Sequence, residues 1–178
     1  MNKLRFQRGF DGFVKHLQSG DKVLDFNYSS GLYAKLFFEK GLEVIAFDKN
    51  PLGHDKSPYA EILNKDPMEA VLPFRSFNGV WITDSLTGLS KDTLPLVISQ
   101  CVDWLTVTGS LYLCMLEGDG EKVVQQQLPT GIKTKRIVYY QPEEIDQILN
   151  YFDCPAVEAW YENNLDRRWI HILAQRKR

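Results

Sequence analysis

The feature of this sequence that most restricts its fold is a short unit near the N-terminus, in which strand, helix and strand signals follow one another. Residues 22–26 (KVLDF) form an apolar run of strand length. Residues 32–40 carry apolar side chains at the spacing of one helix face and are followed by Gly41, and residues 43–47 (EVIAF) form a second apolar run. Because so short a crossover packs its helix on the sheet, the two strands are expected to be parallel neighbours.

The same alternation of strand and helix signals continues through the rest of the chain. Further strands are predicted over residues 59–64, 78–83, 110–116, 157–161 and 168–175. Further helices are predicted over residues 6–17, 93–105 and 142–151. The stretch that precedes the last of these helices is polar and contains glycine, and no element is predicted there. Seven strands with interleaved helices indicate one open, doubly wound α/β sheet, and we expect residues 1–178 to form a single domain.

Composition and charge argue against several classes of protein. The chain has 21 Lys and Arg against 23 Asp and Glu, so no polybasic field favours nucleic acid or an anionic membrane. No apolar run approaches the ~20 residues of a membrane span, and the first residues lack the apolar region of a secretory signal. The three cysteines form no CxxC pair and the three histidines form no HExxH motif, so no metal site is expected. We expect a cytoplasmic monomer or homodimer without a nucleic-acid or membrane partner.

In sheets of this kind ligands bind beyond the carboxyl ends of the strands, so the loop after the first strand is informative. It reads VLDFNYSSG, with Asp25, Asn27, Ser29 and Gly31 at alternating positions. The loop lacks the GxGxxG pattern that dinucleotide binding requires, and no GxxxxGK[ST] motif occurs in the chain. These absences argue against nicotinamide and flavin dinucleotides and against a P-loop enzyme.

What the loop resembles is the first motif of class I S-adenosylmethionine (SAM)-dependent methyltransferases, Asp-x-Gly-x-Gly-x-Gly followed by a helix and by a strand that ends in an acid. Asp25 and Gly31 match this motif, whereas Asn27 and Ser29 stand at glycine positions. Asp48 follows Asp25 by 23 positions, where the family has its ribose-binding acid. The resemblance continues in order through LPFRSFNGVWITDSLTGLS, GSLYLCMLEGDGE, YYQPEEIDQILNYF and RRWIHILAQRK. It implies a three-layer, Rossmann-like sheet of seven mostly parallel strands, similar to small bacterial methyltransferases of uncertain substrate.

The resemblance also implies which residues bind SAM. Asp25 would orient the amino end of the methionine, and Asp48 would accept hydrogen bonds from both ribose hydroxyls. Asp66 would hydrogen-bond the adenine amine, with a neighbouring side chain, Pro67 or Met68, packed beside the base. The loop around Thr83 to Ser85 would present polar groups to the methionine end. The full set of cofactor-binding residues implied in this way is Asp25, Asn27, Ser29, Gly31, Asp48, Lys49, Asp66, Pro67, Thr83 and Asp84.

Two features of the loops leave the chemistry open. Among the replacements for glycine, Asn27 is the less costly one, because Asn adopts the left-handed backbone conformation more readily than other non-glycine residues, whereas Ser29 adds a side chain where the cofactor approaches most closely. That side chain could clash with the cofactor or donate a hydrogen bond to its carboxylate. No catalytic base is assigned, since alignment of the reacting groups supplies much of the rate of an in-line displacement. The acids in the loops of the acceptor side could either form an acidic rim around the acceptor or be solvated: Asp84, Glu117, Asp119 and Glu121.

The sequence thus predicts a SAM-dependent methyltransferase that acts on a small-molecule O, N or S nucleophile. The alternative is a protein with a degenerate methyltransferase fold that no longer catalyses the reaction and serves as a binding or regulatory module. The replaced glycines at Asn27 and Ser29 favour this alternative.

Overall fold

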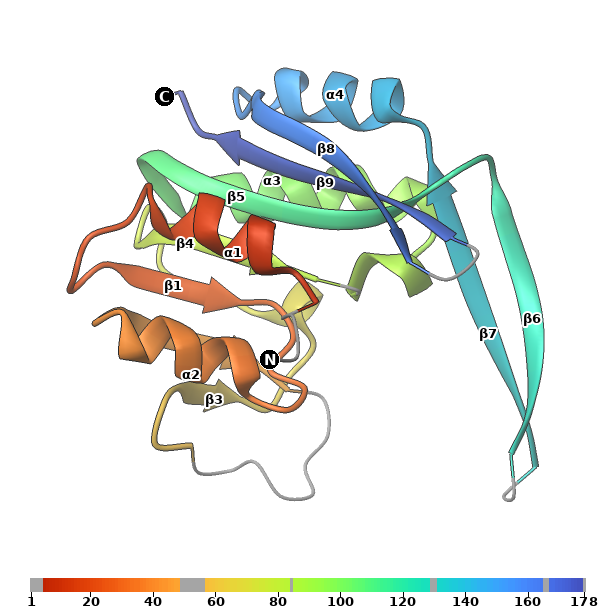
Figure 1. Cartoon of the computed structure of the whole chain (residues 1–178), viewed down its shortest axis with the longest axis horizontal. Helices are drawn as coiled ribbons and strands as arrows, with labels where there is room; N and C mark the ends of the chain where they lie inside the picture. The colour runs from red at the N-terminus through yellow and green to blue at the C-terminus, as the bar shows by residue number, and fades with distance from the viewer. Residues whose placement is uncertain (1–4, 49–56, 84, 129–130, 165–166, 178) are drawn as a thin grey trace.

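The structure, a computed structural model, describes residues 5–48, 57–83, 85–128, 131–164 and 167–177. Its centre is one mixed sheet of nine strands with helices on both faces (Figure 1). The strands are β1 (Lys22–Asp25), β2 (Glu43–Phe47), β3 (Glu61–Leu63), β4 (Phe77–Ile82), β5 (Leu105–Glu117), β6 (Glu121–Leu128), β7 (Gly131–Tyr140), β8 (Ala156–Asn164) and β9 (Arg167–Gln175). The helices are α1 (Gln7–Val14), α2 (Leu32–Glu39), α3 (Leu94–Trp104), α4 (Pro142–Tyr151) and the short 3-10 helices η1 (Pro67–Glu69), η2 (Ser85–Gly88) and η3 (Lys91–Thr93).

Seven of the strands form the sheet that the sequence predicts. They lie in the order β3-β2-β1-β4-β5-β9-β8, in which β3 to β5 are parallel and β9 runs antiparallel to both of its neighbours. The four predicted helices are also present. The α/β, Rossmann-like class is therefore confirmed, and the carboxyl ends of β1, β2 and β4 meet at one edge of the sheet.

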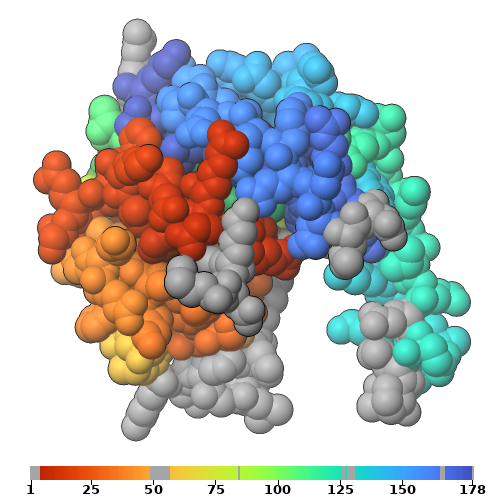
Figure 2. Space-filling model, in the orientation of Figure 1, coloured from red at the N-terminus to blue at the C-terminus, as the bar shows by residue number. Residues whose placement is uncertain are grey.

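Two further strands, β6 and β7, form an antiparallel hairpin that the sequence analysis did not predict. Leu116 of β5 pairs with Tyr139 of β7 on one side and with Trp169 of β9 on the other. The pairing of β4 with β5 ends at Leu113, so β7 takes the place of β4 beside the last residues of β5. Beyond this attachment the hairpin stands away from the body of the molecule as an arm (Figures 1 and 2). Both faces of the arm are exposed, so its residues show no apolar alternation that could have indicated a strand. The prediction of seven strands was therefore too low.

The sheet separates two apolar clusters, one beneath α1 and α2 and the other beneath α3 and α4. At the centre of the first cluster the rings of Trp81 and Tyr112 stack with their centroids 3.9 Å apart. Phe13 of α1 and Phe37 of α2 both pack against Trp81, at 5.3 and 5.6 Å between ring centroids. This aromatic layer holds both helices on β4 and β5. Of the helices in the described ranges, none is long and apolar enough to cross a membrane.

Two glycines of α1 test how closely this helix approaches the sheet. A Cβ atom at Gly9 would lie 2.5 Å from the ring of Tyr112, whereas one at Gly12 would meet nothing nearer than 3.9 Å. We expect Gly9→Ala to lower the free energy of unfolding by about 1–3 kcal/mol through overpacking. The control variant, Gly12→Ala, should raise it by about 0.5–1 kcal/mol through helix propensity. Urea denaturation measures both changes, and equal effects of the two variants would contradict the close packing of α1 on Tyr112.

Candidate functional site

A cavity of about 440 Å³, here called the first cavity, opens at the carboxyl ends of the parallel strands. Its lining comes from the ends of β1 and β2 and the residues that follow them, from Asp66 and η1 after β3, and from η2 and the residue after it. The lining residues are Phe26, Asn27, Phe47, Asp48, Asp66, Pro67, Met68, Ser85 and Leu89. The structure therefore brings together four of the residues that the sequence analysis assigned to cofactor binding: Asn27, Asp48, Asp66 and Pro67.

Asp25, the last residue of β1, lies below the surface next to this cavity. Its side chain is only 1% exposed, and its Oδ1 accepts a hydrogen bond from the backbone N–H of Asn27 at 3.1 Å. Burial raises the pKa of Asp25 to about 7, and the hydrogen bond from Asn27 opposes part of this shift. Asp25 is thus a buried carboxyl whose hydrogen-bond partner, Asn27, lines the cavity.

The loop after β1 reverses direction at a residue other than the expected one. Tyr28 is held to the end of β2 by its N–H, which donates to the carbonyl of Phe47 at 2.8 Å. The left-handed backbone conformation then falls on Ser29, with φ of 48°, and on Gly31, with φ of 71°. Asn27, the replacement that tolerates this conformation better, does not take it, because the anchored Tyr28 keeps the chain beside β2 until after that residue.

Ser29 and Gly31 do not line the first cavity. Ser29 is exposed and is not among the residues that line this cavity. Gly31 precedes α2 and lies against Tyr28, whose Oη would be 2.5 Å from a Cβ atom at this position. Gly31 is therefore needed both for its backbone conformation and for the space that Tyr28 occupies.

Two carboxylates reach the first cavity from neighbouring strands. Asp48 follows β2 and is 7% exposed, and its backbone N–H donates to the carbonyl of Leu63 in β3 at 3.2 Å. Asp66 precedes η1, and its Oδ1 accepts the N–H of Met68 at 3.0 Å. The backbone of Asp48 and the side chain of Asp66 are thus each held by a hydrogen bond, and both residues line the cavity.

The first cavity also has apolar walls, which were not predicted from the sequence. Phe26 and Phe47 follow or end neighbouring parallel strands, and their ring centroids are 5.8 Å apart in an edge-to-face arrangement. Leu89 closes the cavity beyond η2. Phenylalanine at the end of a buried strand has the same pattern as a core residue, so only its alignment with the ligand-binding edge of the sheet could have indicated this role.

The remaining predicted residues lie elsewhere. Thr83 is buried, and its carbonyl accepts a hydrogen bond from Ser85 Oγ at 3.0 Å, but it does not line the first cavity. Lys49 and Asp84 lie outside the described residues. Among the residues that the structure describes, no group of three metal-ligating side chains occurs.

The three described acids of the suggested acidic rim are engaged on the surface instead. Glu117 pairs with Arg168 at 3.1 Å, Glu121 pairs with Arg136 at 3.5 Å, and Asp119 accepts a hydrogen bond from Gln141. None of these acids lines the first cavity. Their contacts account for them as surface carboxylates, the second of the two alternatives left open above.

The buried carboxyl of Asp25 gives the protein a testable pH dependence. Its pKa in the folded state is about 7 against 3.8 for the free side chain, so the folded state holds the extra proton between these values. The contribution of Asp25 to the free energy of unfolding therefore falls as the pH rises through this window and is lowest above it. Asp25→Asn cannot ionise, and its stability relative to the unmodified protein should rise by about 2–3 kcal/mol between pH 5 and 8.

Urea denaturation of both proteins across this pH range measures the effect. Asp146→Asn, which removes an exposed carboxylate of α4, is the matched control and should show no such rise. A difference between Asp25→Asn and the unmodified protein that does not change with pH would contradict the raised pKa.

No family of known sequences matches this chain, and no curated protein is similar to it in sequence. Solved structures, in contrast, match it over nearly its whole length. The 1,6-didemethyltoxoflavin-N1-methyltransferase of Burkholderia thailandensis, solved with S-adenosylhomocysteine (SAH), has a TM-score of 0.78 at 15% identity, covering 99% of this chain and 80% of its own.

Two further structures extend the similarity. A SAM-dependent methyltransferase of Methanosarcina mazei has a TM-score of 0.77 at 16% identity over 92% of this chain and 95% of its own. A phosphoethanolamine N-methyltransferase of Haemonchus contortus, solved with phosphomonomethylethanolamine and SAH, has a TM-score of 0.70 at 12% identity over 97% of this chain and 53% of its own. At these identities the likeness concerns the fold. The chain has the fold of class I SAM-dependent methyltransferases.

Proposed function

We propose that this protein binds SAM in the first cavity and transfers its methyl group to a small-molecule nucleophile. The observation that carries the proposal is that Asn27, Asp48 and Asp66 line one cavity, from loops that follow three adjacent parallel strands. The volume of about 440 Å³ lies within the range of small-molecule sites. We include in the proposal a single domain, a cytoplasmic location and a monomer or homodimer.

The groups of the first cavity suit a nucleoside. The ionised carboxylate of Asp48 accepts hydrogen bonds only, which matches the two hydroxyls of a ribose. A carboxylate offers about four acceptor positions, so Asp66 can cap η1 and also accept a hydrogen bond from an adenine amine. Phe26 and Phe47 provide an apolar wall against which a ring system can pack.

The order of the strands sets the direction of the bound cofactor. With the nucleoside held by Asp48 and Asp66 beside β2 and β3, the amino-acid portion extends towards β1 and β4. Asn27 and Ser85 line the cavity on that side. SAM supplies an electrophilic methyl group on its sulfonium. The role of the protein is to hold this methyl group in line with the acceptor. Alignment of this kind contributes much of the rate of a displacement reaction.

The alternative of a degenerate binding module depends on the replaced glycines, and of Asn27 and Ser29 it is the serine whose side chain could obstruct the cofactor. Ser29 is exposed and lies outside the lining of the first cavity. Its side chain therefore gives no steric reason for loss of cofactor binding, and the methyltransferase proposal has the stronger support.

The role of Asp48 can be measured by calorimetry with SAM and with SAH. Asp48→Ala should weaken binding of both by about 1–3 kcal/mol through loss of charge-assisted hydrogen bonds. Asp146→Asn, on the exposed face of α4, is the control and should bind as the unmodified protein does. If the unmodified protein binds neither SAM nor SAH at millimolar concentration, the proposed function is wrong.

A second prediction distinguishes the proposal from its degenerate alternative. Ser29→Gly removes a side chain from a left-handed backbone position and should raise the free energy of unfolding by about 1 kcal/mol. Its affinity for SAH should equal that of the unmodified protein, because Ser29 does not line the first cavity. A large gain in affinity would instead indicate a binding site that the serine impairs, as the alternative requires.

A further inference from the structure

A second cavity, of about 240 Å³, lies across η2 from the first one. Ser85 of η2 lines the first cavity, and Thr87 of the same helix lines the second. The other walls come from the segment before α1, the end of β5, the middle of β7 and the start of β9. A molecule in the second cavity would therefore lie next to the β4 side of the first, towards which the reactive end of SAM extends in the proposed function.

The second cavity is lined by three cationic side chains, those of Arg5, Lys135 and Arg167. No carboxylate occurs among its described lining residues. The guanidinium of Arg5 lies 5.1 Å from the ring centroid of Trp169, which also lines this cavity. Three positive charges from distant parts of the sequence thus converge in a protein whose net charge is −2.

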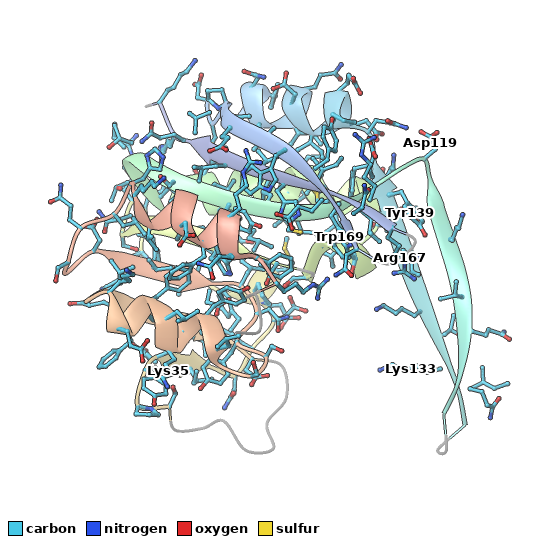
Figure 3. The ribbon with its side chains drawn as sticks, viewed as in Figure 1. Lys35, Asp119, Lys133, Tyr139, Arg167 and Trp169 are labelled. Carbon is cyan, nitrogen blue, oxygen red and sulfur yellow. The ribbon has the colours of Figure 1, made fainter. Side chains whose placement is uncertain are left out.

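Strand alternation separates these cations from their neighbours in sequence. Arg136 and Arg168 follow Lys135 and Arg167 directly, and each forms an ion pair with an acid, Glu121 and Glu117 respectively. Successive side chains of a strand point to opposite faces, so Lys135 and Arg167 are directed away from these acids. Within the described part of the chain neither of the two forms an ion pair. Figure 3 shows Arg167 and Trp169 on the side of the body that faces the arm.

We propose that the second cavity binds the anionic group of the methyl acceptor, a carboxylate or a phosphate. This inference rests on the proposed function, and it narrows the acceptor to a small organic anion. Arginine presents a planar fork of donors that fits two oxygens of either group, and Lys135 adds a point charge from the arm. Lys135 and Arg167 carry like charges in one concave site, and a bound anion reduces the repulsion between them.

The test uses calorimetry on the protein loaded with SAH. Benzoate and phenyl phosphate are the anionic probes, and benzamide and phenol are their neutral counterparts. We expect the anions to bind and the neutral compounds not to bind. The anion with the higher affinity shows whether a carboxylate or a phosphate is the preferred group. Arg167→Gln and Lys135→Gln should each weaken the anion by about tenfold or more.

A matched control removes one positive charge elsewhere. Lys35 lies on α2, far from the arm in Figure 3, and Lys35→Gln should leave anion binding unchanged. The SAH affinity of all three variants should equal that of the unmodified protein, which shows that each remains folded.

The outcomes separate the two proposals. If SAH binds but neither anion does, or if Lys35→Gln weakens the anion as much as Arg167→Gln, the anion site is wrong and the methyltransferase proposal is unaffected. If SAH does not bind, the same titrations are made without it. Anion binding that depends on Arg167 would then support an anion site, but its assignment to a methyl acceptor would be overturned together with the proposed function.

Discussion

The parallel pairing of β1 between β2 and β4 is the constraint on which both cavities depend. In this register Asp25 lies beside Ala46 on one side and beside Trp81 on the other, so the three strands end at nearly the same level. The loops that follow must therefore converge at one edge of the sheet, and they supply Asn27, Asp48 and η2 to a common opening. Trp81 of β4 pairs with Tyr112 of β5 and stacks on its ring, so the alignment of the strands extends to β5. The end of β5 in turn lines the second cavity.

The loop after β1 shows how a turn closes when two of the expected glycines are absent. Tyr28 anchors the chain to β2 and fills the space beside Gly31, and the left-handed conformation then falls on Ser29 at the exposed side of the turn. Asp25 is buried beneath the same loop with a raised pKa. Both features cost stability, and both lie next to the candidate site, where such local costs are commonly found in proteins.

The arm formed by β6 and β7 changes the character of the acceptor side. A balanced composition argues correctly against a broad basic surface, but it says nothing about where individual charges meet. Lys135 and Arg167 are brought together because β7 and β9 border the same end of β5. A protein of net negative charge can therefore hold a local cluster of cations. This cluster lies on the acceptor side, where an acidic rim was one of the two expectations.

The sequence by itself determined the order, along the chain, of seven strands and four helices, because apolar periodicity records which face of each element is buried. The resemblance of its loops to methyltransferase motifs also pointed to Asn27, Asp48, Asp66 and Pro67, which the structure brings to one cavity. Only the tertiary structure decided that Ser29 rather than Asn27 is left-handed, that Phe26 and Phe47 form a cavity wall, and that β6 and β7 pair. These features depend on contacts between distant residues, or on strands exposed on both faces, and neither leaves a periodic pattern in the sequence.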